Sequence, residues 1–483
     1  MDHFKIALGM KNMYNKIAKS NRYIIDLNPI LEIICQQIIK VAHSLVQHLF
    51  FQPCAKIIET IKEIIHSEHF LKEHRLSPSD FSRDRKLSFS KLILFFINLN
   101  KRSYQDELDS FFKTLCDLDI DEHKVTKAAL SKARRKLDHK AFIDLNVHLS
   151  ALFHQYFSLP TWHGFNLLSL DGSTVRLPYT EAIVDHFDAW HPRQGGKCCL
   201  ARISQLYNVM SKSTVDAIIC PKSTGERELA RQHFDWVGAD DLVLLDRGYT
   251  AFWLFKTVLM KQAHFCARVS NTHWNAVRKF YRSGKKEKIV TIKPSYPAIQ
   301  RCREHGLDTT PLTLRLIRVD LDNGETEILM TSLLDTIAYP QSEFAALYHL
   351  RWSVEEDYKV IKHRIEVENF SGKTVHSIYQ DFHAKIFTKS LTAVLSYPLR
   401  DVIKTRFSHR QYDYQLNVTQ VLSRMKDTIV LLLHKNVTYI EQMIQKLHKL
   451  FLTLVEPIRP GRKYPRKPKF KGRSFYTSYK PIR

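Results

Sequence analysis

Two aspartates follow short apolar segments of this sequence, a setting in which carboxylates can do chemistry. Asp171 follows residues 165–170, and Asp246 follows residues 242–245. Such segments predict buried strands, and neighbouring strands in one sheet would bring the two carboxylates together. Close carboxylates repel unless a cation lies between them or one is protonated. Oxygen ligands of this kind favour Mg²⁺ or Mn²⁺, which support phosphoryl transfer. Taken singly, each aspartate is better explained as a turn residue.

A third carboxylate lies within residues 348–362, whose composition predicts a helix. At about 100° per residue, one stripe of roughly 60° holds four residues, namely Tyr348, Arg351, Glu355 and Lys362. Glu355 would hold a metal ion, while the phenol, guanidinium and ammonium would contact phosphate. An exposed helix stabilised by Arg–Glu and Glu–Lys pairs explains the same pattern. Geometry alone leaves both interpretations open.

These residues carry a resemblance to a known family. The spacing Tyr-x₂-Arg-x₃-Glu-x₆-Lys resembles the Y-R-E-K signature of bacterial insertion-sequence transposases of the insertion-sequence-four type. The segments at 171–174 and 246–249 resemble the family's two Asp motifs, and the order Asp, Asp, Glu resembles its DDE triad, with separations of 75 and 109 residues. Residues 81–87 and 125–137 are similar to the family's N-terminal helical region. The resemblance spans roughly residues 80 to 390.

The resemblance implies an α/β fold with a ribonuclease-H-like catalytic core, a β-rich insertion, and helical N-terminal and C-terminal regions. It implies a catalytic and metal-binding triad of Asp171, Asp246 and Glu355, which would bind two Mg²⁺ ions with Mn²⁺ as a substitute. The implied activity is cleavage of DNA at the ends of an insertion sequence, followed by strand transfer into target DNA. Tyr348, Arg351 and Lys362 would grip DNA phosphates.

Two further features follow from the resemblance. Some relatives stack a flipped base on a Trp of the β-rich insertion, and Trp274 is the Trp of that block here; plain packing is the alternative role. The pair Glu226-Arg227 resembles one that follows the first Asp in relatives. The implied partners are double-stranded DNA, both as terminal inverted repeats and as target, and a second copy of the chain in a synaptic homodimer.

The charge of the chain agrees with a nucleic-acid partner. It has 483 residues with 73 Lys and Arg against 49 Asp and Glu, a net charge of +24, which predicts a polyanionic partner. Residues 459–483 hold ten Lys or Arg and no acidic residue, which is typical of a flexible basic arm. The candidate DNA contacts in this arm are Arg462, Lys463, Arg466 and Lys467. Arg134, Arg135 and Lys136 lie in a second basic segment, for which a solvated helix face is an equal explanation.

Several classes are not favoured. The eight Cys form no C-x-x-C pair, which argues against a structural zinc site and suggests reduced thiols in a cytosolic compartment. The N-terminus lacks the layout of a signal peptide, and the apolar region at 30–51 is interrupted by polar residues. We therefore expect no membrane association, and a cytoplasmic, nucleoid-associated protein in a bacterium.

Changes in residue pattern along the chain, together with the family resemblance, predict seven segments. The first four are a helical N-terminal region (1–78), a helical DNA-binding region (79–158), a first part of the catalytic core with both Asp (159–261) and a β-rich insertion (262–340). The last three are a second part of the core with the Y-R-E-K helix (341–400), C-terminal helices (401–456) and the basic arm (457–483). The leading hypothesis is a cut-and-paste DNA transposase. The alternatives are a catalytically inactive, transposon-derived DNA-binding protein and a metal-dependent nuclease without strand transfer.

Overall fold

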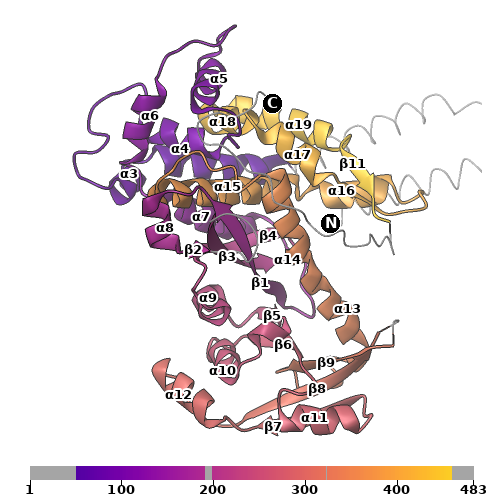
Figure 1. Ribbon diagram of the computed structural model, residues 1–483. Coiled ribbons are helices and arrows are strands. Elements are labelled where there is room, and N and C mark those ends of the chain that lie inside the picture. Colours follow the sequence, from indigo (N-terminus) through magenta and orange to yellow (C-terminus); the bar gives the residue numbers. More distant parts are fainter. Residues whose placement is uncertain (1–50, 191–197, 322–323, 460–483) are drawn as a thin grey trace, which may run out of the picture.

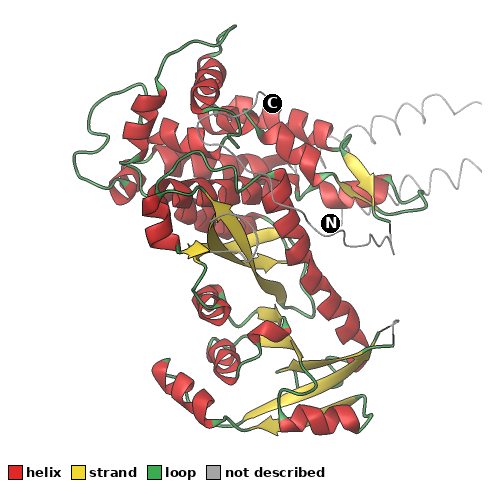
Figure 2. Ribbon diagram, viewed as in Figure 1, coloured by secondary structure: helices red, strands yellow, loops and turns green. Residues whose placement is uncertain are grey.

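The computed structural model describes residues 51–190, 198–321 and 324–459. A helical layer forms one side of the molecule, a mixed sheet lies beneath it, and a β-rich block extends from the far edge of that sheet (Figure 1; Figure 2). Within the described ranges, no helix combines the length and apolar character needed to span a bilayer. The basic arm and most of the predicted region 1–78 lie outside the described residues.

The sheet has nine strands in the order β2-β3-β1-β5-β6-β9-β8-β7, with β4 pairing along β3. The strands are β1 (Asn166–Leu177), β2 (Ala189–Trp190), β3 (Cys198–Asn208), β4 (Ser213–Pro221), β5 (Asp241–Leu245), β6 (His264–Val269), β7 (Glu287–Ile292), β8 (Leu312–Asp320) and β9 (Thr326–Thr331). β5 pairs in parallel with β1 and with β6, whereas the other pairs in this sheet are antiparallel. The sheet therefore changes from antiparallel to parallel at β1.

Both faces of the central strands are buried, which explains their continuous apolar sequence. On β5, Leu242 and Leu244 enter one core, while Val243 and Leu245 enter the other. The first core is covered by α8 (Glu181–Phe187), α13 (Phe344–His349), α14 (Ser353–Lys359) and α15 (Val375–Ser396). The second core is covered by α9 (Glu226–His233), α10 (Phe252–Met260), α11 (Asn275–Arg282) and α12 (Tyr296–Glu304).

The helical layer joins two distant parts of the chain in one core. Its N-terminal part consists of the helical residues 51–66 with α3 (Glu68–His74), α4 (Phe89–Ile97), α5 (Tyr104–Cys116), α6 (Lys127–Arg134) and α7 (Lys140–Tyr156). Its C-terminal part consists of α16 (Leu399–Arg406), α17 (Val418–Met425), α18 (Thr428–His434) and α19 (Val437–Phe451), with a small sheet of β10 (Tyr414–Leu416) and β11 (Val455–Pro457). Between the layers runs α15, which supplies Phe382 to the sheet core and Phe387 to the helical core.

The helices predicted for the N-terminal region and the strands predicted for residues 262–340 are present in the described residues. β8 and β9 form a hairpin, with Asp320 opposite Thr326 and Gly324 at a φ of 81° in the turn. The β-rich block also continues the main sheet, because β6 pairs with β5 and β9 pairs with β6. The seven segment boundaries stay predictions.

Candidate active site

Strand register places the two aspartates side by side. β1 and β5 are parallel neighbours, with Ser169 opposite Leu244. Asp171 and Asp246 each lie two residues beyond this pair, and residues two apart on a strand share a face. Both carboxylates therefore lie at one level of the sheet, on the face that Leu242 and Leu244 bury against α13 and α14.

Asp171 differs from its predicted setting in one respect. It does not close a strand, because β1 continues to Leu177 in antiparallel pairing with β3. Only the pairing with β5 ends near this point, at Ser169. The turn interpretation of Asp171-Gly172 is wrong, since both residues pair in the ladder with Gln205 and Ser204. The signal for a longer strand is the alternation of apolar and polar residues after Ser173.

Glu355 lies on α14, and the continuous helical segment from α13 to α14 is fixed to the sheet by three hydrogen bonds. The Tyr348 hydroxyl donates to the Leu245 carbonyl over 3.2 Å, and the Tyr358 hydroxyl donates to the Asp171 carbonyl over 2.7 Å. The Ser169 hydroxyl donates to the Arg351 carbonyl over 3.3 Å. The backbone next to each aspartate thus holds the helix that carries the third carboxylate.

The segment that was predicted to be one regular helix changes pitch twice. A 3₁₀ turn at Leu350–Trp352 precedes α14, and a π turn at Val360–Arg364 follows it. The prediction assumed a constant angle per residue, whereas the hydrogen bonds to the sheet fix the segment at separate points. π turns are rare and occur frequently at functional sites. Lys362, in the π turn, still reaches the site and donates to the Ser173 hydroxyl over 2.6 Å.

The three carboxylates interact electrostatically. Burial, with a contribution from the nearby Glu355 and Asp246 carboxylates, raises the pKa of Asp171 to about 6. Burial also acts to raise the pKa of Asp246, but the Arg247 N–H and the Arg268 guanidinium outweigh it and hold that pKa below its usual value. The raised pKa shows that negative charge on Asp171 is disfavoured in the metal-free site. A divalent cation bound there would stabilise that charge.

Two arginines currently supply positive charge to this site. Arg268 on β6 donates to Asp246 Oδ1 from Nη2 over 2.8 Å, and Arg351 donates to Glu355 Oε1 from Nη2 over 2.8 Å. Among the described residues, the ligand oxygens of the three carboxylates do not all lie within 4.8 Å of one another. The donor set suits a hard divalent ion, because it consists of carboxylate oxygens.

Tyr348 and Arg351 lie inside the protein. Their residues are 4% and 1% exposed, and the Arg351 guanidinium lies over the rings of Tyr348 and Trp352. Its Nε and Nη1 atoms are buried and have no hydrogen-bond partner. The Arg–Glu pair of the alternative interpretation is therefore present, but its arginine is buried and retains unused donors. Unused buried donors are costly, and a phosphate oxygen would satisfy them.

A buried polar network supports α14 from behind. Asp357, two residues after Glu355, accepts from Gln205 Nε2 over 2.9 Å and pairs with Lys389 of α15. Gln205 lies opposite Asp171 in the β1–β3 ladder and also accepts from the Thr214 hydroxyl over 3.2 Å. Burial lowers the pKa of Lys389 against the attraction of Asp357. This network links the strand beside one catalytic candidate to the helix of another.

An open pocket of about 880 Å³ adjoins the site. Its lining includes Trp253 and Trp274 together with three arginines, Arg202, Arg227 and Arg301. Trp274 is partly buried, and its ring centroid lies 6.1 Å from that of Phe255. The predicted pair Glu226-Arg227 also lines this pocket, where Glu226 forms an ion pair with Arg202 at 2.9 Å.

The predicted basic residues have different environments. Arg134 is buried and donates to Gln380, Asp381, Ser371 and the Ser377 carbonyl, so its guanidinium binds the protein interior. Arg135 is exposed, and Lys136 forms an ion pair with Asp80 at 3.2 Å. Arg462, Lys463, Arg466 and Lys467 lie outside the described residues. A pairing role for Arg134 was not visible in sequence because its partners lie about 240 residues away.

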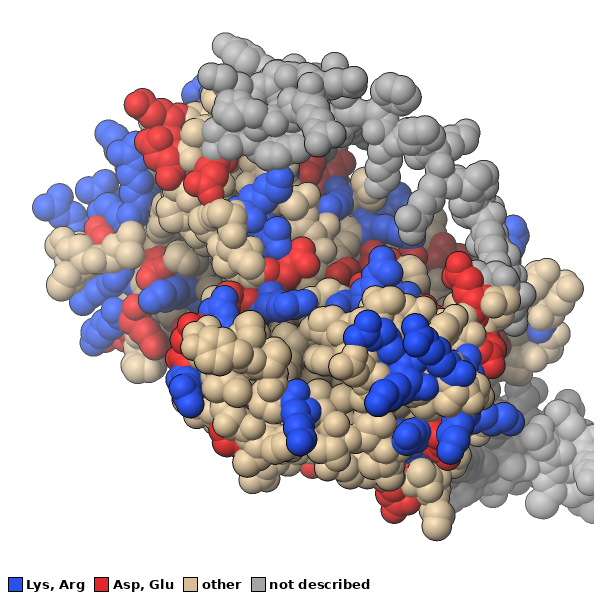
Figure 3. All heavy atoms as spheres, turned by 60° about the horizontal axis from the view of Figure 1, so that its bottom comes forward, with Lys and Arg blue, Asp and Glu red and all other residues tan. Residues whose placement is uncertain are grey.

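Sequence reasoning missed an exposed basic run in the β-rich block. Lys and Arg side chains gather on the face of this block that Figure 3 brings forward. Six exposed basic residues on and after α11 contribute to the charge of the block, namely Arg278, Lys279, Arg282, Lys285, Lys286 and Lys288. Glu287 is the single acidic residue in that interval of sequence, so the local charge imbalance was the available signal.

Comparison with known proteins shows which proteins this chain resembles. Residues 162–388 match the family model described as the transposase DDE domain, and this range contains Asp171, Asp246 and Glu355. This segment of the chain is therefore similar to transposase DDE domains.

A curated protein similar to this chain is an insertion-sequence transposase. The chain is 26% identical over 247 residues to transposase InsG for insertion sequence element IS4 of Escherichia coli (strain K12). The aligned region covers 50% of this chain and 54% of the relative, so the chain spans about half the length of that protein. The predicted resemblance to transposases of the insertion-sequence-four type is confirmed.

A solved structure shows a looser likeness. The cryo-EM structure of a piggyBac transposase synaptic complex with hairpin DNA has a TM-score of 0.39 at 11% identity, covering 87% of this chain and 86% of that chain. This likeness is too low to assign the fold.

Proposed function

We propose that the chain is a DNA transposase that cleaves DNA at insertion-sequence ends and joins the freed 3′ ends to target DNA. The observation that carries the proposal is that Asp171, on β1, and Asp246, directly after the parallel neighbour β5, lie at the same level beneath the helix of Glu355. The strand order β4-β3-β1-β5-β6, with three antiparallel strands followed by two parallel ones, supports a ribonuclease-H-like core.

Asp171, Asp246 and Glu355 would hold two Mg²⁺ ions, or Mn²⁺ in their place. Such ions lower the pKa of bound water and stabilise charge on the attacking and leaving oxygens of a phosphodiester. The protein supplies position: the sheet fixes two carboxylates, and hydrogen bonds from Tyr348 and Tyr358 fix the helix of the third. Binding of cations would free Arg351 and Arg268 from their carboxylates, and both could then donate to phosphate oxygens.

DNA would contact the chain at several basic surfaces. Arg351 has two buried donors without partners, and Lys362 lies beside Ser173, so both could bind phosphates next to the cut site. Tyr348 would act as the third member of the phosphate-binding group. Arg135, Lys136, the basic run at 278–288 and the arm at 457–483 would track the backbone further away. Trp274 and its pocket would receive an unstacked base.

The proposed DNA partners are the terminal inverted repeats of the element and the target duplex, bound by two copies of the chain in a synaptic complex. Cell location follows from the substrate, at the nucleoid of a bacterium. Two protomers are expected because two element ends must be cut and joined together.

The proposal is tested by cleavage of a labelled duplex that carries the element's own ends. Wild type with Mg²⁺ or Mn²⁺ should release a 3′-OH at the boundary and join it to target DNA. Glu355→Gln should bind the duplex but lose cleavage by at least about 10³-fold, because it removes one of the three carboxylates that would hold the metal ions. The matched control is Glu356→Gln, at the next position on α14, where Glu356 is 69% exposed and pairs with Lys359.

Two outcomes would refute the proposal in different ways. Binding by wild type with no metal-dependent products would indicate an inactive, transposon-derived DNA-binding protein. Cleavage without any joined product, when a pre-cut 3′-OH end is supplied, would indicate a nuclease. Cleavage that Glu355→Gln retains would remove this glutamate from the reaction.

A further inference from the structure

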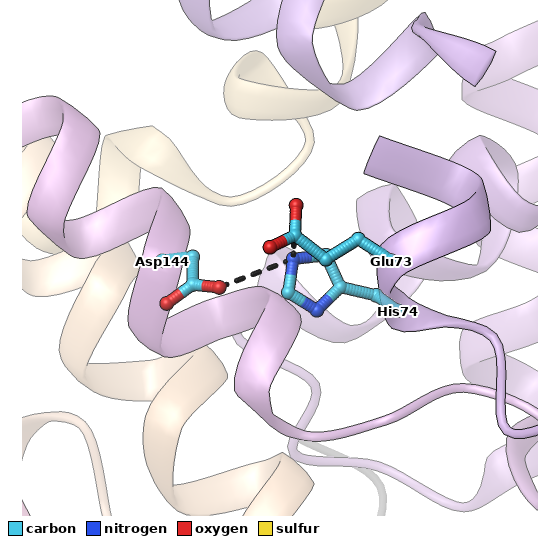
Figure 4. Close-up of side chains that lie close together, drawn as sticks. All are labelled: Glu73, His74 and Asp144. Carbon is cyan, nitrogen blue, oxygen red and sulfur yellow. Dashed lines mark ion pairs between the residues drawn. The ribbon is translucent and has the colours of Figure 1, made fainter. Parts of the chain in front are cut away.

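A group of potential metal ligands lies far from the DDE carboxylates in sequence, within the helical layer. Glu73 and His74 end α3, and Asp144 lies on α7. The ligand atoms of these three residues all lie within 4.8 Å of one another. Figure 4 shows the Asp144 and Glu73 carboxylates near one nitrogen of the His74 ring, with dashed lines from that nitrogen to each.

His74 is the unusual member of this group. Its side chain is 3% exposed, and its Nε2 atom is buried without a hydrogen-bond partner. Asp144 Oδ2 lies 3.2 Å from this nitrogen and Glu73 Oε2 lies 4.0 Å from it, yet neither contact forms a hydrogen bond. A buried polar atom without a hydrogen-bond partner destabilises a folded protein. A ligand bound to this nitrogen would remove that destabilisation.

The spacing suits a transition metal. Ligands about 2.1 Å from a tetrahedral Zn²⁺ ion lie about 3.4 Å from one another, and the two distances from His74 Nε2 lie on either side of this value. An imidazole nitrogen without a hydrogen-bond partner can offer its lone pair to a metal ion.

The carboxylates leave the site open to solution. The side chains of Glu73 and Asp144 are 54% and 41% exposed, so an ion can enter and water can complete its coordination. A divalent cation between the two carboxylates would relieve the repulsion between them.

We infer that Glu73, His74 and Asp144 form a second metal site, which binds one Zn²⁺ ion and is separate from the catalytic carboxylates. Its ligand set of one imidazole and two carboxylates favours zinc over magnesium, because nitrogen ligands suit transition metals. No cysteine is involved, which is why the absence of C-x-x-C pairs in the sequence gave no indication of it.

The position of the site gives the ion a structural task. The segment after His74 pairs with the segment that joins α6 to α7, through a bridge between Arg75 and Leu137. Leu76 N–H donates to the Lys136 carbonyl over 3.0 Å, and Asp138 N–H donates to the His74 carbonyl over 2.8 Å. An ion bound to His74 and Asp144 would fasten α3 to α7 and stabilise the connection that carries Arg135 and Lys136.

The test is a Zn²⁺ titration of chelator-treated, full-length protein by calorimetry, with Co²⁺ absorption as a report of coordination. The background variant Asp171→Asn with Glu355→Gln removes the competing catalytic carboxylates. We expect one Zn²⁺ per chain in this background and a Zn²⁺-dependent rise in unfolding temperature. Asp144→Asn should weaken binding by more than about 100-fold, the upper end of what losing an outer-shell partner costs.

Variants at the exposed positions keep the test independent of folding. Glu73→Gln and Asp144→Asn change surface side chains, so loss of zinc can be measured in protein that still unfolds cooperatively. The control is His154→Asn, because His154 is an exposed histidine on the same helix as Asp144. Zinc binding that survives Asp144→Asn, or that disappears in the catalytic background alone, would overturn the inference. No binding at all would identify the contact as an ordinary His–Asp ion pair.

Discussion

Asp171→Asn should stabilise the metal-free protein while abolishing DNA cleavage. Asparagine has the same shape as aspartate, and its carbonyl oxygen can still accept from the Gly172 N–H that contacts Asp171. The substitution removes only the charge that burial, Glu355 and Asp246 disfavour. A carboxylate that we propose to bind metal would thereby be shown to weaken the metal-free fold.

The size of the effect follows from the pKa of Asp171. That pKa is about 6 in the folded protein against an ordinary value of 3.8, a difference of about 2 units at about 1.4 kcal/mol per unit. Because the folded pKa is raised, the stability from this proton is complete below pH 3.8 and is lost as the pH rises through about 6. Wild type should therefore be less stable than Asp171→Asn by about 3 kcal/mol at pH 8 and by about half of that at pH 5.

The assay is urea unfolding of both proteins in the presence of a chelator at several pH values. Glu356→Gln serves as the control and should show no such change with pH, since its side chain is 69% exposed. Added Mg²⁺ at pH 8 should raise the unfolding midpoint of wild type more than that of Asp171→Asn. A difference between the two proteins that is independent of pH would show that ionisation of Asp171 is not what weakens the fold.

Three further perturbations address the surroundings of the site. Lys389→Met should destabilise the protein by about 3–5 kcal/mol in urea unfolding, because it leaves the buried Asp357 carboxylate without its cation; adding Asp357→Leu should recover most of the loss, and equal instability of the double variant would contradict the ion-pair explanation. Arg268→Ala should raise the pKa of Asp246, whose hydrogen bond it removes, and cleavage at pH 6 should fall relative to pH 8; an unchanged pH–rate profile would argue against this coupling. Alanine substitutions of Arg278, Lys279 and Arg282 in the basic run of the β-rich block should reduce the slope of log affinity against log salt by about 0.9 for each lost phosphate contact. Alanine substitutions of the exposed Lys446 and Lys449 on α19 serve as controls and should leave this slope unchanged.

The proposed catalytic residues stand out in the sequence because each belongs to a local pattern. Asp246 directly follows an apolar strand, and Glu355 belongs to a spaced set on one segment. Short-range patterns therefore predicted the candidate residues and the kinds of element that carry them. The adjacency of β1 and β5 was an expectation, and its register was set by contacts between segments 75 residues apart.

The rest of the site depends on long-range contacts that no local pattern contains. Arg268 was not distinguishable from other arginines of the chain until β6 was placed beside β5. Arg351 was expected to face DNA on an exposed stripe, but the packing of its segment on the sheet buries it. Arg134 is similar, because its partners Gln380 and Asp381 belong to α15.

The shared core of the helical layer has a consequence for how the molecule is made. Phe95 and Phe111, from the first quarter of the chain, pack in one cluster with Leu391 and Ile444 near its other end. Contacts between such distant segments form slowly, because the entropy of closing a long loop is lost before the contacts contribute any stabilisation. During synthesis, the apolar faces of the N-terminal helices stay exposed until α15 and α19 have been translated. The nascent chain should therefore depend on chaperones over this interval, and premature termination before α15 should yield a fragment that aggregates or is degraded.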